Sequence, residues 1–339
     1  MPRIDLPAVT QWITAAALRE GDHLPAVVMQ RLGISRRGAA KLLRRLVDGQ
    51  WLSSEGTPRR PRFRPGVLRQ VVQRYPLAGL EEDEPWRRDF APCFDLRPNV
   101  ARIAQHAFCE LLNNAVDHSG GTSVAVSLRQ TAMHLQLLVS DDGCGLFERI
   151  GQSFAIDDPA LAMFELAKGK LTSEPDRHSG RGLFFTSRLA DVFDLHANRR
   201  AFQFRGWGRR GWFPGKPMAR QGTSAYLAIA LDSERSLDAV LREHSTSGAG
   251  YAFETTQVPL QLIGGAAVGF ESRAQARRVV SGLQRFRRAE IDFSGVDELG
   301  HGFADELFRV LPRAHPGIEL VPVSMAPRVA EMIAAVRLE

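Results

Sequence analysis

The chain has little cysteine and no long apolar stretch. Three cysteines occur among its 339 residues, Cys93, Cys109 and Cys144. Because their number is odd and they lack paired metal-type spacing, neither a disulfide framework nor a zinc site is expected. No basic-then-apolar leader opens the sequence, and the longest apolar run, around residues 225–231, is too short to span a bilayer. We therefore expect a cytoplasmic location and no membrane partner.

The charge is positive and unevenly placed. The formal net charge is +6, and residues 31–64 hold ten Arg or Lys against two acidic residues, which is +8 there and −2 elsewhere. Charge gathered near one end favours a polyanionic partner over general solubility. The length and the 44% apolar content predict two or three folded domains.

Residues 6–47 carry the pattern of three short helices. A turn at Gly33 and an N-cap at Ser35 precede the third helix, and residues 51–52 and 62–64 are predicted as two strands of a basic wing. This segment resembles a winged helix-turn-helix domain over residues 1–65, which implies DNA binding. A helical module with a solvated basic face that binds protein is the alternative. The expected DNA contacts are Ser35, Arg36, Arg37, Lys41, Arg44, Arg45, Arg59, Arg60, Arg62 and Arg64.

A helical period over residues 100–115 places Glu110 and Asn114 one turn apart on the same face. An amide oxygen suits Mg²⁺, and a carboxylate one turn away can orient or deprotonate an attacking water or hydroxyl. This division of roles is what phosphoryl transfer requires.

Two further motifs fit a nucleotide. Alternating apolar residues over 133–139 predict a strand that ends at Asp141, whose carboxylate can accept a hydrogen bond from an adenine amino group. Gly143 and Gly145 follow and let the backbone approach a flat base. Gly180 and Gly182 open a predicted helix that runs to about residue 192, and its N-terminus would face phosphates.

In order and spacing, these motifs and Gly222-Thr223 resemble the GHKL superfamily of ATPases and kinases over about residues 95–232. The resemblance implies a Bergerat-type α/β sandwich, a mixed sheet with helices on one face, that binds ATP with Mg²⁺. It gives Glu110 the role of general base, Asn114 that of magnesium ligand and Asp141 that of adenine reader. The nucleotide-binding residues expected in all are Asn114, Asp141, Gly143, Gly145, Lys170, Gly180, Arg181, Gly182, Leu183 and Thr223.

One position departs from the pattern of histidine kinases, which often carry a lysine three residues after the asparagine. Asp117 stands there in this chain. Lys168, Lys170 or Arg181 is therefore expected to neutralise the triphosphate. None of the nine histidines is followed by Glu or Asp, which disfavours an ordinary sensor histidine kinase.

Beyond residue 250 strands and helices alternate, which predicts a small α/β domain. Strands are expected at 258–263 and 289–293, and helices at 272–286, 301–311 and 326–336. Residues 291–306 resemble a STAS-like domain, the fold of anti-anti-sigma factors, over about 255–337, and imply a protein partner. The position of the usual phosphoacceptor reads Gly300-His301-Gly302 and offers no hydroxyl, and a turn role is expected for the nearby Ser294.

The expected architecture is multi-domain α/β. A winged helix (1–65), a connector (66–94), an ATP-binding domain (95–232), a linker (233–254) and a STAS-like domain (255–339) follow one another. The function expected is an ATP-binding, ATP-hydrolysing DNA-bound regulator in which a lid around 170–179 orders over the nucleotide. A serine/threonine protein kinase of the partner-switching type and a non-catalytic nucleotide sensor remain open alternatives. A homodimer is consistent with both resemblances.

Overall fold

The computed structural model describes residues 4–57, 60–172, 179–208, 210–248, 250–264 and 269–338. The chain forms two compact units, Met1–Gly143 with Gly222–Glu234, and Cys144–Gln221 with Arg235–Glu339. Both units contain helices and strands, so the predicted α/β class is confirmed.

The first unit begins with three helices and a hairpin of two antiparallel strands. Gly33 ends α2 in the left-handed region at φ 62°, and the Ser35 hydroxyl caps α3 by accepting from Gly38 N at 3.3 Å, as predicted. The hairpin strands are longer than the sequence suggests. The elements are α1 (Leu6–Glu20), α2 (Leu24–Leu32), α3 (Arg36–Asp48), β1 (Leu52–Thr57) and β2 (Arg60–Pro65).

Helix α3 divides into an apolar and a basic face. Its buried residues, which join the core of the N-terminal helices, are Ala39, Leu42, Leu43 and Leu46. The hairpin is fixed to the α1–α2 turn because Phe63 N donates to Gly21 O at 3.1 Å, and a Cβ at position 21 would lie 2.2 Å from Phe63 O. Arg62 also binds Asp22 through two hydrogen bonds.

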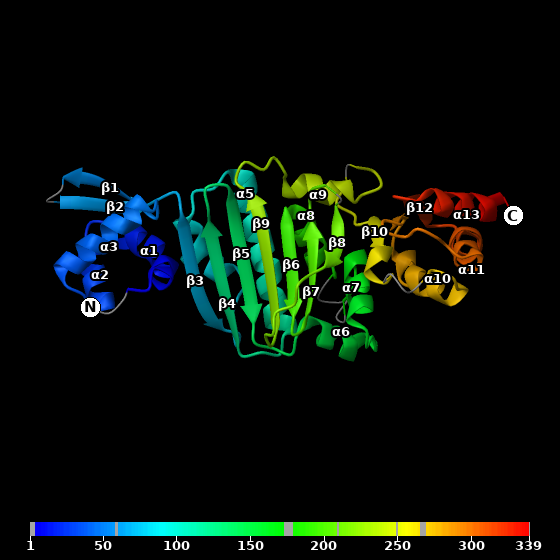
Figure 1. Ribbon diagram of the computed structural model, residues 1–339, viewed down its shortest axis with the longest axis horizontal. Helices are drawn as coiled ribbons and strands as arrows, with labels where there is room; N and C mark the ends of the chain where they lie inside the picture. The colour runs from blue at the N-terminus through cyan, green and yellow to red at the C-terminus, as the bar shows by residue number, and fades with distance from the viewer. Residues whose placement is uncertain are drawn as a thin grey trace. The chain divides into compact units, whose positions relative to one another are not determined.

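Four antiparallel strands in the order β3-β4-β5-β9 form the sheet of the first unit. Helix α5 packs on one face of this sheet, behind the strands in Figure 1, through its buried apolar stripe. Residues 66–94, expected as a connector, supply the edge strand β3, which the sequence did not reveal because Arg and Gln interrupt its apolar alternation. The elements are β3 (Arg69–Pro76), β4 (Ser123–Gln130), β5 (His134–Asp141), β9 (Thr223–Ala230) and α5 (Pro98–His118).

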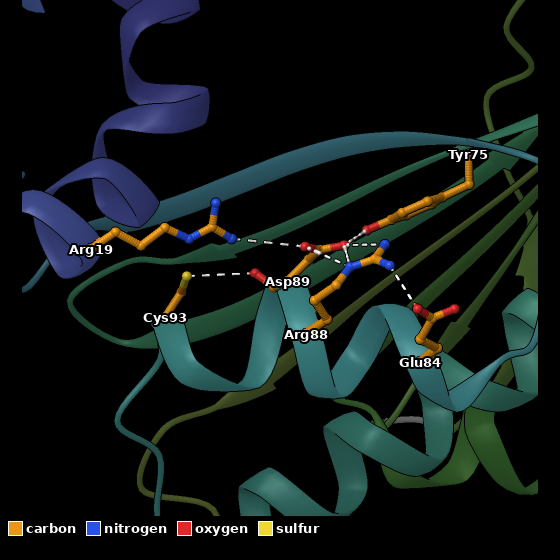
Figure 2. A network of polar contacts seen from close by, with 6 residues as sticks. All are labelled: Arg19, Tyr75, Glu84, Arg88, Asp89 and Cys93. Carbon is orange, nitrogen blue, oxygen red and sulfur yellow. Dashed lines mark hydrogen bonds and ion pairs between the residues drawn. The ribbon is translucent and has the colours of Figure 1, made fainter. Parts of the chain in front are cut away.

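A polar network centred on Asp89 joins the N-terminal helices to this sheet (Figure 2). Asp89 lies in the helical segment formed by α4 (Asp83–Pro85), η1 (Trp86–Phe90) and η2 (Ala91–Cys93). Its carboxylate accepts from Tyr75 Oη at 2.7 Å and from Arg88, and Arg19 of α1 lies 3.9 Å away. Burial would raise the pKa of Asp89, but the hydrogen bonds from Arg88 and Tyr75 outweigh it and the pKa is lowered.

The second unit holds a three-stranded antiparallel group, β6-β7-β8, and a parallel group, β10-β11-β12. The elements are α6 (Leu146–Phe154), α7 (Pro159–Lys168), α8 (Gly182–Leu189), β6 (Val192–Ala197), β7 (Arg200–Arg205), β8 (Gly211–Pro214), α9 (Leu237–Glu243), β10 (Thr255–Pro259), η3 (Leu260–Leu262), α10 (Arg273–Val280), η4 (Leu283–Arg285), β11 (Arg288–Asp292), α11 (His301–Asp305), η5 (Glu306–Val310), α12 (Leu311–Ala314), β12 (Glu319–Val323) and α13 (Pro327–Leu338).

Several elements of the second unit differ from those expected. The strand placed at 258–263 is β10, which starts earlier and ends at Pro259. The helix placed at 272–286 stops at Val280, because Gly282 follows at φ 78°. Strand β12 was not predicted, since Pro322 disguises its pattern. Among the described residues, no helix combines the length and apolar character needed to cross a membrane.

The Asp89 network gives a stability prediction. Replacing Asp89 by Ala leaves the buried Tyr75 hydroxyl without its acceptor, so we expect a loss of about 1–3 kcal/mol in urea unfolding of the first unit. Asp83→Ala is the matched control, because its pair with Arg87 is solvent-exposed and worth under about 1 kcal/mol. Equal losses in the two variants would contradict a structural role for the network.

Candidate functional site

The residues predicted to bind nucleotide fall into two sets, one in each unit. In the first unit, Glu110 and Asn114 lie one turn apart on α5, and both are half-buried. The Asn114 Nδ2 atom is buried and has no hydrogen-bond partner. An unpaired buried amide is costly in a folded protein, which marks this position as a candidate ligand site.

Asp141 closes strand β5 where β9 begins. The side chain is 5% exposed, and its Oδ1 accepts from Gly143 N at 2.9 Å and from Thr223 N at 3.0 Å. A side chain at position 222 is excluded, since its Cβ would lie 2.3 Å from Asp141 O. Three residues predicted at the site, Asp141, Gly143 and Thr223, are thus joined by two hydrogen bonds.

Gly143 in turn abuts the end of α5. A Cβ at this position would lie 2.1 Å from the carbonyl oxygen of Ser119, so only glycine fits. Ser119 itself is held because its hydroxyl donates to Ala115 O at 2.5 Å and accepts from Gly121 N at 3.0 Å. The strand that carries Asp141 is therefore locked against the helix that carries Glu110 and Asn114.

Asp142 is a residue whose part in the site the sequence did not reveal. Its carboxylate accepts four hydrogen bonds of 2.7 to 2.9 Å from the backbone N–H groups and hydroxyls of Thr122 and Ser123. These bonds, those from Ser123 first, hold the pKa of Asp142 well below its usual range. Asp142 thus fixes the start of β4 to the end of β5 beside Asp141. A Thr-Ser pair ahead of a strand was the only signal available.

The second set surrounds the Gly180-Arg181-Gly182 motif. Lys170 N donates to Gly180 O at 3.0 Å, and Gly180 has φ 65° with Leu171 O only 2.6 Å from the place of a Cβ. Helix α8 starts at Gly182 as predicted, with Leu183 in its first turn, but it ends at Leu189 rather than near 192 because Ala190 is extended. The Arg181 Nε atom is buried without a hydrogen-bond partner.

Gly145, also in the second unit, has φ 95° and precedes α6. The space beside Gly145 is filled by the side chain of Asn198. Asn198 Nδ2 donates to Cys144 O at 2.9 Å and would lie 2.5 Å from a Cβ on Gly145. Of the lid expected at 170–179, residues 173–178 lie outside the described part of the chain.

The lysines expected to meet phosphate both have protein partners here. Lys168 is 2% exposed and bonds Glu165 at 2.6 Å, while Lys170 Nζ donates to Arg285 O at 2.6 Å. Burial lowers the pKa of the Lys168 amine and raises that of Glu165. The pKa of Lys170 is lowered by burial and then by Arg181.

Four of the basic residues predicted to contact DNA line a groove of the N-terminal helices and hairpin. A groove of about 740 Å³ is lined by α3, β1 and β2, including Arg36, Arg44, Arg60 and Arg62. Arg59 lies outside the described residues. The other predicted contacts are exposed on the same elements: Ser35, Arg37, Lys41, Arg45 and Arg64.

The C-terminal part shows no acceptor hydroxyl at the start of α11, where Gly300 is the N-cap and His301 the first residue. Ser294 is 8% exposed, and its N–H donates to Asp292 Oδ1 at 2.9 Å, which is a turn contact. Within the described ranges, no cluster of three or more His, Cys, Asp or Glu side chains could hold a metal ion.

Comparison with known families identifies two of the predicted domains. Residues 99–231 match the family of histidine kinase-, DNA gyrase B- and HSP90-like ATPases, and residues 275–330 match a STAS-like domain of unknown function. A search of curated proteins found no significant match. Neither family match covers residues 1–65. The chain therefore contains a GHKL-type ATPase domain, which supports ATP binding, and a STAS-like domain.

Asp142 gives a prediction about stability and pH. Asp142→Asn replaces an acceptor by a donor that faces the donors of Thr122 and Ser123, so we expect a lower melting temperature at pH 7. Because the folded pKa is depressed, the contribution of Asp142 is complete above its unfolded pKa of about 3.9 and is lost as the pH falls toward the folded value.

The difference in melting temperature between wild type and Asp142→Asn should therefore shrink between pH 6 and pH 2.5. Asp157→Asn, at an exposed carboxylate, serves as the control and should change little at either pH. A difference in melting temperature that grows on acidification would refute the stabilising role of the hydrogen bonds to Asp142.

Proposed function

We propose that this chain is a regulator that binds Mg-ATP in its ATPase domain and DNA through its N-terminal module, with the two events coupled. The observation that supports nucleotide binding is the arrangement of Asp141, Gly143 and Thr223. Two hydrogen bonds join these residues, and Gly143 packs against the end of α5. A buried carboxylate held by two backbone N–H groups, with glycine on either side, suits the edge of a purine base.

The residues present also fit magnesium. The Asn114 amide is half-buried on α5, and one of its two polar atoms is buried without a partner. Rotating the amide by 180° exchanges nitrogen for oxygen at that place, which offers Mg²⁺ the hard ligand that it prefers. A bound Mg²⁺ would supply positive charge that offsets the charge of the phosphates. Asn114 would hold the ion, and Lys170 and Arg181 would be the protein cations for the phosphates.

Glu110 is the proposed general base. It lies one turn before Asn114 on the same face of α5, so it can hold a water or hydroxyl near the same phosphates and take its proton. This assignment supports ATP hydrolysis. Turnover with release of free phosphate is the expected activity, and label passing from γ-labelled ATP to a protein would instead favour the kinase.

For the N-terminal module we propose a winged helix-turn-helix that binds DNA. Support comes from a capped third helix with exposed arginines, an antiparallel hairpin beside it, and a groove lined by Arg36, Arg44 and Arg60 from both. Phosphate contacts from such a surface give affinity, and Ser35, Arg36 and Arg37 at the start of α3 would supply base contacts.

The coupling is proposed to run through the segment around Asp89. Phe108 of α5 packs on Trp86 at 5.3 Å and on Phe90 at 5.1 Å between ring centroids. These rings flank Asp89, whose carboxylate faces Arg19 of α1 in Figure 2. A shift of α5 on nucleotide binding would thus reach α1 through packed groups, and lid ordering around residue 170 is the proposed two-state event.

Asn114→Ala tests the nucleotide half. We expect ATP affinity in the presence of Mg²⁺, measured by calorimetry, to fall at least about tenfold, the effect of losing one ligand worth about 1.4 kcal/mol or more. Asn113→Ala is the matched control, because it removes the same amide from the adjacent position of α5. Asp141→Asn should weaken ATP more than GTP, since adenine presents an amino group at C6, where guanine presents a carbonyl oxygen. No heat of ATP binding to folded wild type would end the proposal.

Arg44→Ala tests the DNA half. Loss of one phosphate contact should weaken binding to any duplex and reduce the slope of log K against log salt by about 1, measured by fluorescence anisotropy. Arg149→Ala removes an exposed charge from α6 and should leave the slope unchanged. Addition of Mg-ATP should shift DNA affinity of the wild type and not of Asn114→Ala. An identical salt slope in Arg44→Ala would exclude the groove.

A further inference from the structure

The end of α7 is held by elements of the STAS-like domain. The Lys168 amine donates to Glu165 Oε1 at 2.6 Å, to Ser281 O at 2.8 Å and to Val279 O at 3.4 Å. Its own carbonyl accepts from Thr256 Oγ1 at 2.6 Å. Since Val279 and Ser281 lie within the STAS-like match, the amine of Lys168, a residue of the ATPase domain, is bonded to two backbone carbonyls of the STAS-like domain.

Gly169 brings the backbone against an aromatic ring. It has φ 78°, and a Cβ there would lie 2.7 Å from the ring of Phe253. Phe253 also packs on Phe184 of α8, at 4.5 Å between centroids, and on Phe286, at 5.1 Å. The Phe253 ring thus contacts Gly169, helix α8 and the STAS-like domain.

Lys170 completes the contact with two reciprocal hydrogen bonds. Its amine donates to Arg285 O at 2.6 Å, and Arg285 Nη1 donates to Lys170 O at 3.0 Å. The amine also lies 4.2 Å from the centre of the Phe286 ring, a cation–π distance. The backbone of Lys170 adopts φ 59°, which a residue with a side chain rarely takes, so tertiary contacts must hold it there.

An amine that donates to the Arg285 carbonyl in this position is turned toward the STAS-like domain. Lys170 is also a cation assigned to the phosphates under the proposed function, and Lys168 is fully enclosed, so it cannot take over the role without leaving its carboxylate partner. Phosphate and the Arg285 carbonyl therefore compete for the same amine.

We infer that the STAS-like domain restrains nucleotide binding within the same chain by holding Lys170 on the carbonyl of Arg285, a contact that must open for Lys170 to reach phosphate. The inference rests on the proposed function, which makes Lys170 a phosphate ligand. By linkage, whatever pulls η4 away from Lys170 raises ATP affinity, and ATP in turn loosens η4.

A double-mutant cycle tests this restraint. Arg285→Ala keeps the backbone carbonyl but removes the reciprocal bond from the guanidinium to Lys170 O, which helps to hold that carbonyl against the Lys170 amine. Arg285 is exposed, so the fold should persist. We expect Mg-ATP to bind this variant of the full chain roughly three- to tenfold more tightly than wild type, the scale of one partly exposed charge-assisted hydrogen bond. In the Lys170→Ala background, the same substitution should have no effect.

Arg278→Ala is the control for charge, since it removes one exposed arginine from the neighbouring helix α10 and should not tighten ATP binding. The restraint is overturned if Arg285→Ala leaves ATP affinity unchanged, if it matches Arg278→Ala, or if its effect persists without Lys170. These results leave ATP binding and its loss in Asn114→Ala intact. Absence of ATP binding in all variants would instead defeat the proposed function and the restraint with it.

Discussion

The proposed nucleotide site depends on the contact between the end of β5 and the start of β9. One oxygen of Asp141 accepts from two backbone N–H groups, at Gly143 and Thr223. The backbone beside each donor lies too close to a carbonyl oxygen to carry a side chain: Gly222 lies against Asp141 O, and Gly143 lies against Ser119 O. The carboxylate is therefore positioned by backbone on one side and by the end of α5 on the other. If Asp141 recognises the base as proposed, a carboxylate held in this way needs no reorganisation when a ligand arrives, which favours affinity.

The two flanking modules are attached by different physics. Part of the contact between the N-terminal helices and the sheet is the Arg19–Asp89 pair, whose arginine is largely exposed, so this pair is weak alone and easily exchanged. The Thr14 hydroxyl of α1 also accepts from Gln70 N of β3 at 3.1 Å. By contrast, the STAS-like domain buries the Lys168–Glu165 pair. Burial lowers the pKa of the lysine and raises that of the glutamate, which favours the neutral form of both. A buried ion pair adds little net stability, because desolvation offsets the attraction, but it penalises every arrangement that separates the partners. The first attachment suits transmission of small shifts, and the second fixes one register between α7 and α10.

Much of this could be predicted from the sequence, and the exceptions have physical causes. Helices α1 to α3, the cap at Ser35 and the buried stripe of α5 follow from local periodicity and capping, which short windows of sequence contain. The motifs around Asp141 and Gly180 carry their own backbone requirements and so were recognisable. Strand β3 was not, since its partner β4 lies some fifty residues away and Arg and Gln interrupt its apolar alternation. The partners of Asp142 and Lys170 were also out of reach, because a hydrogen bond to Thr122 or to the carbonyl of Arg285 leaves no local pattern.

The contact of Lys170 with the Arg285 carbonyl indicates what a STAS-like domain that lacks an acceptor hydroxyl contributes to this chain. In partner switching, a phosphorylated hydroxyl alters contacts of the STAS fold, and the start of α11 offers none here. A domain without that group can still transmit a signal if its own position changes the affinity of the ATPase domain for ligand. The carbonyl of Arg285 and the ring of Phe286 supply such a dependence without chemistry on the domain itself. Its magnitude is bounded by one charge-assisted hydrogen bond and one cation–π contact, enough to bias a two-state equilibrium and too little to abolish ATP binding. A restraint of that size makes the STAS-like domain a modulator of nucleotide affinity rather than a substrate.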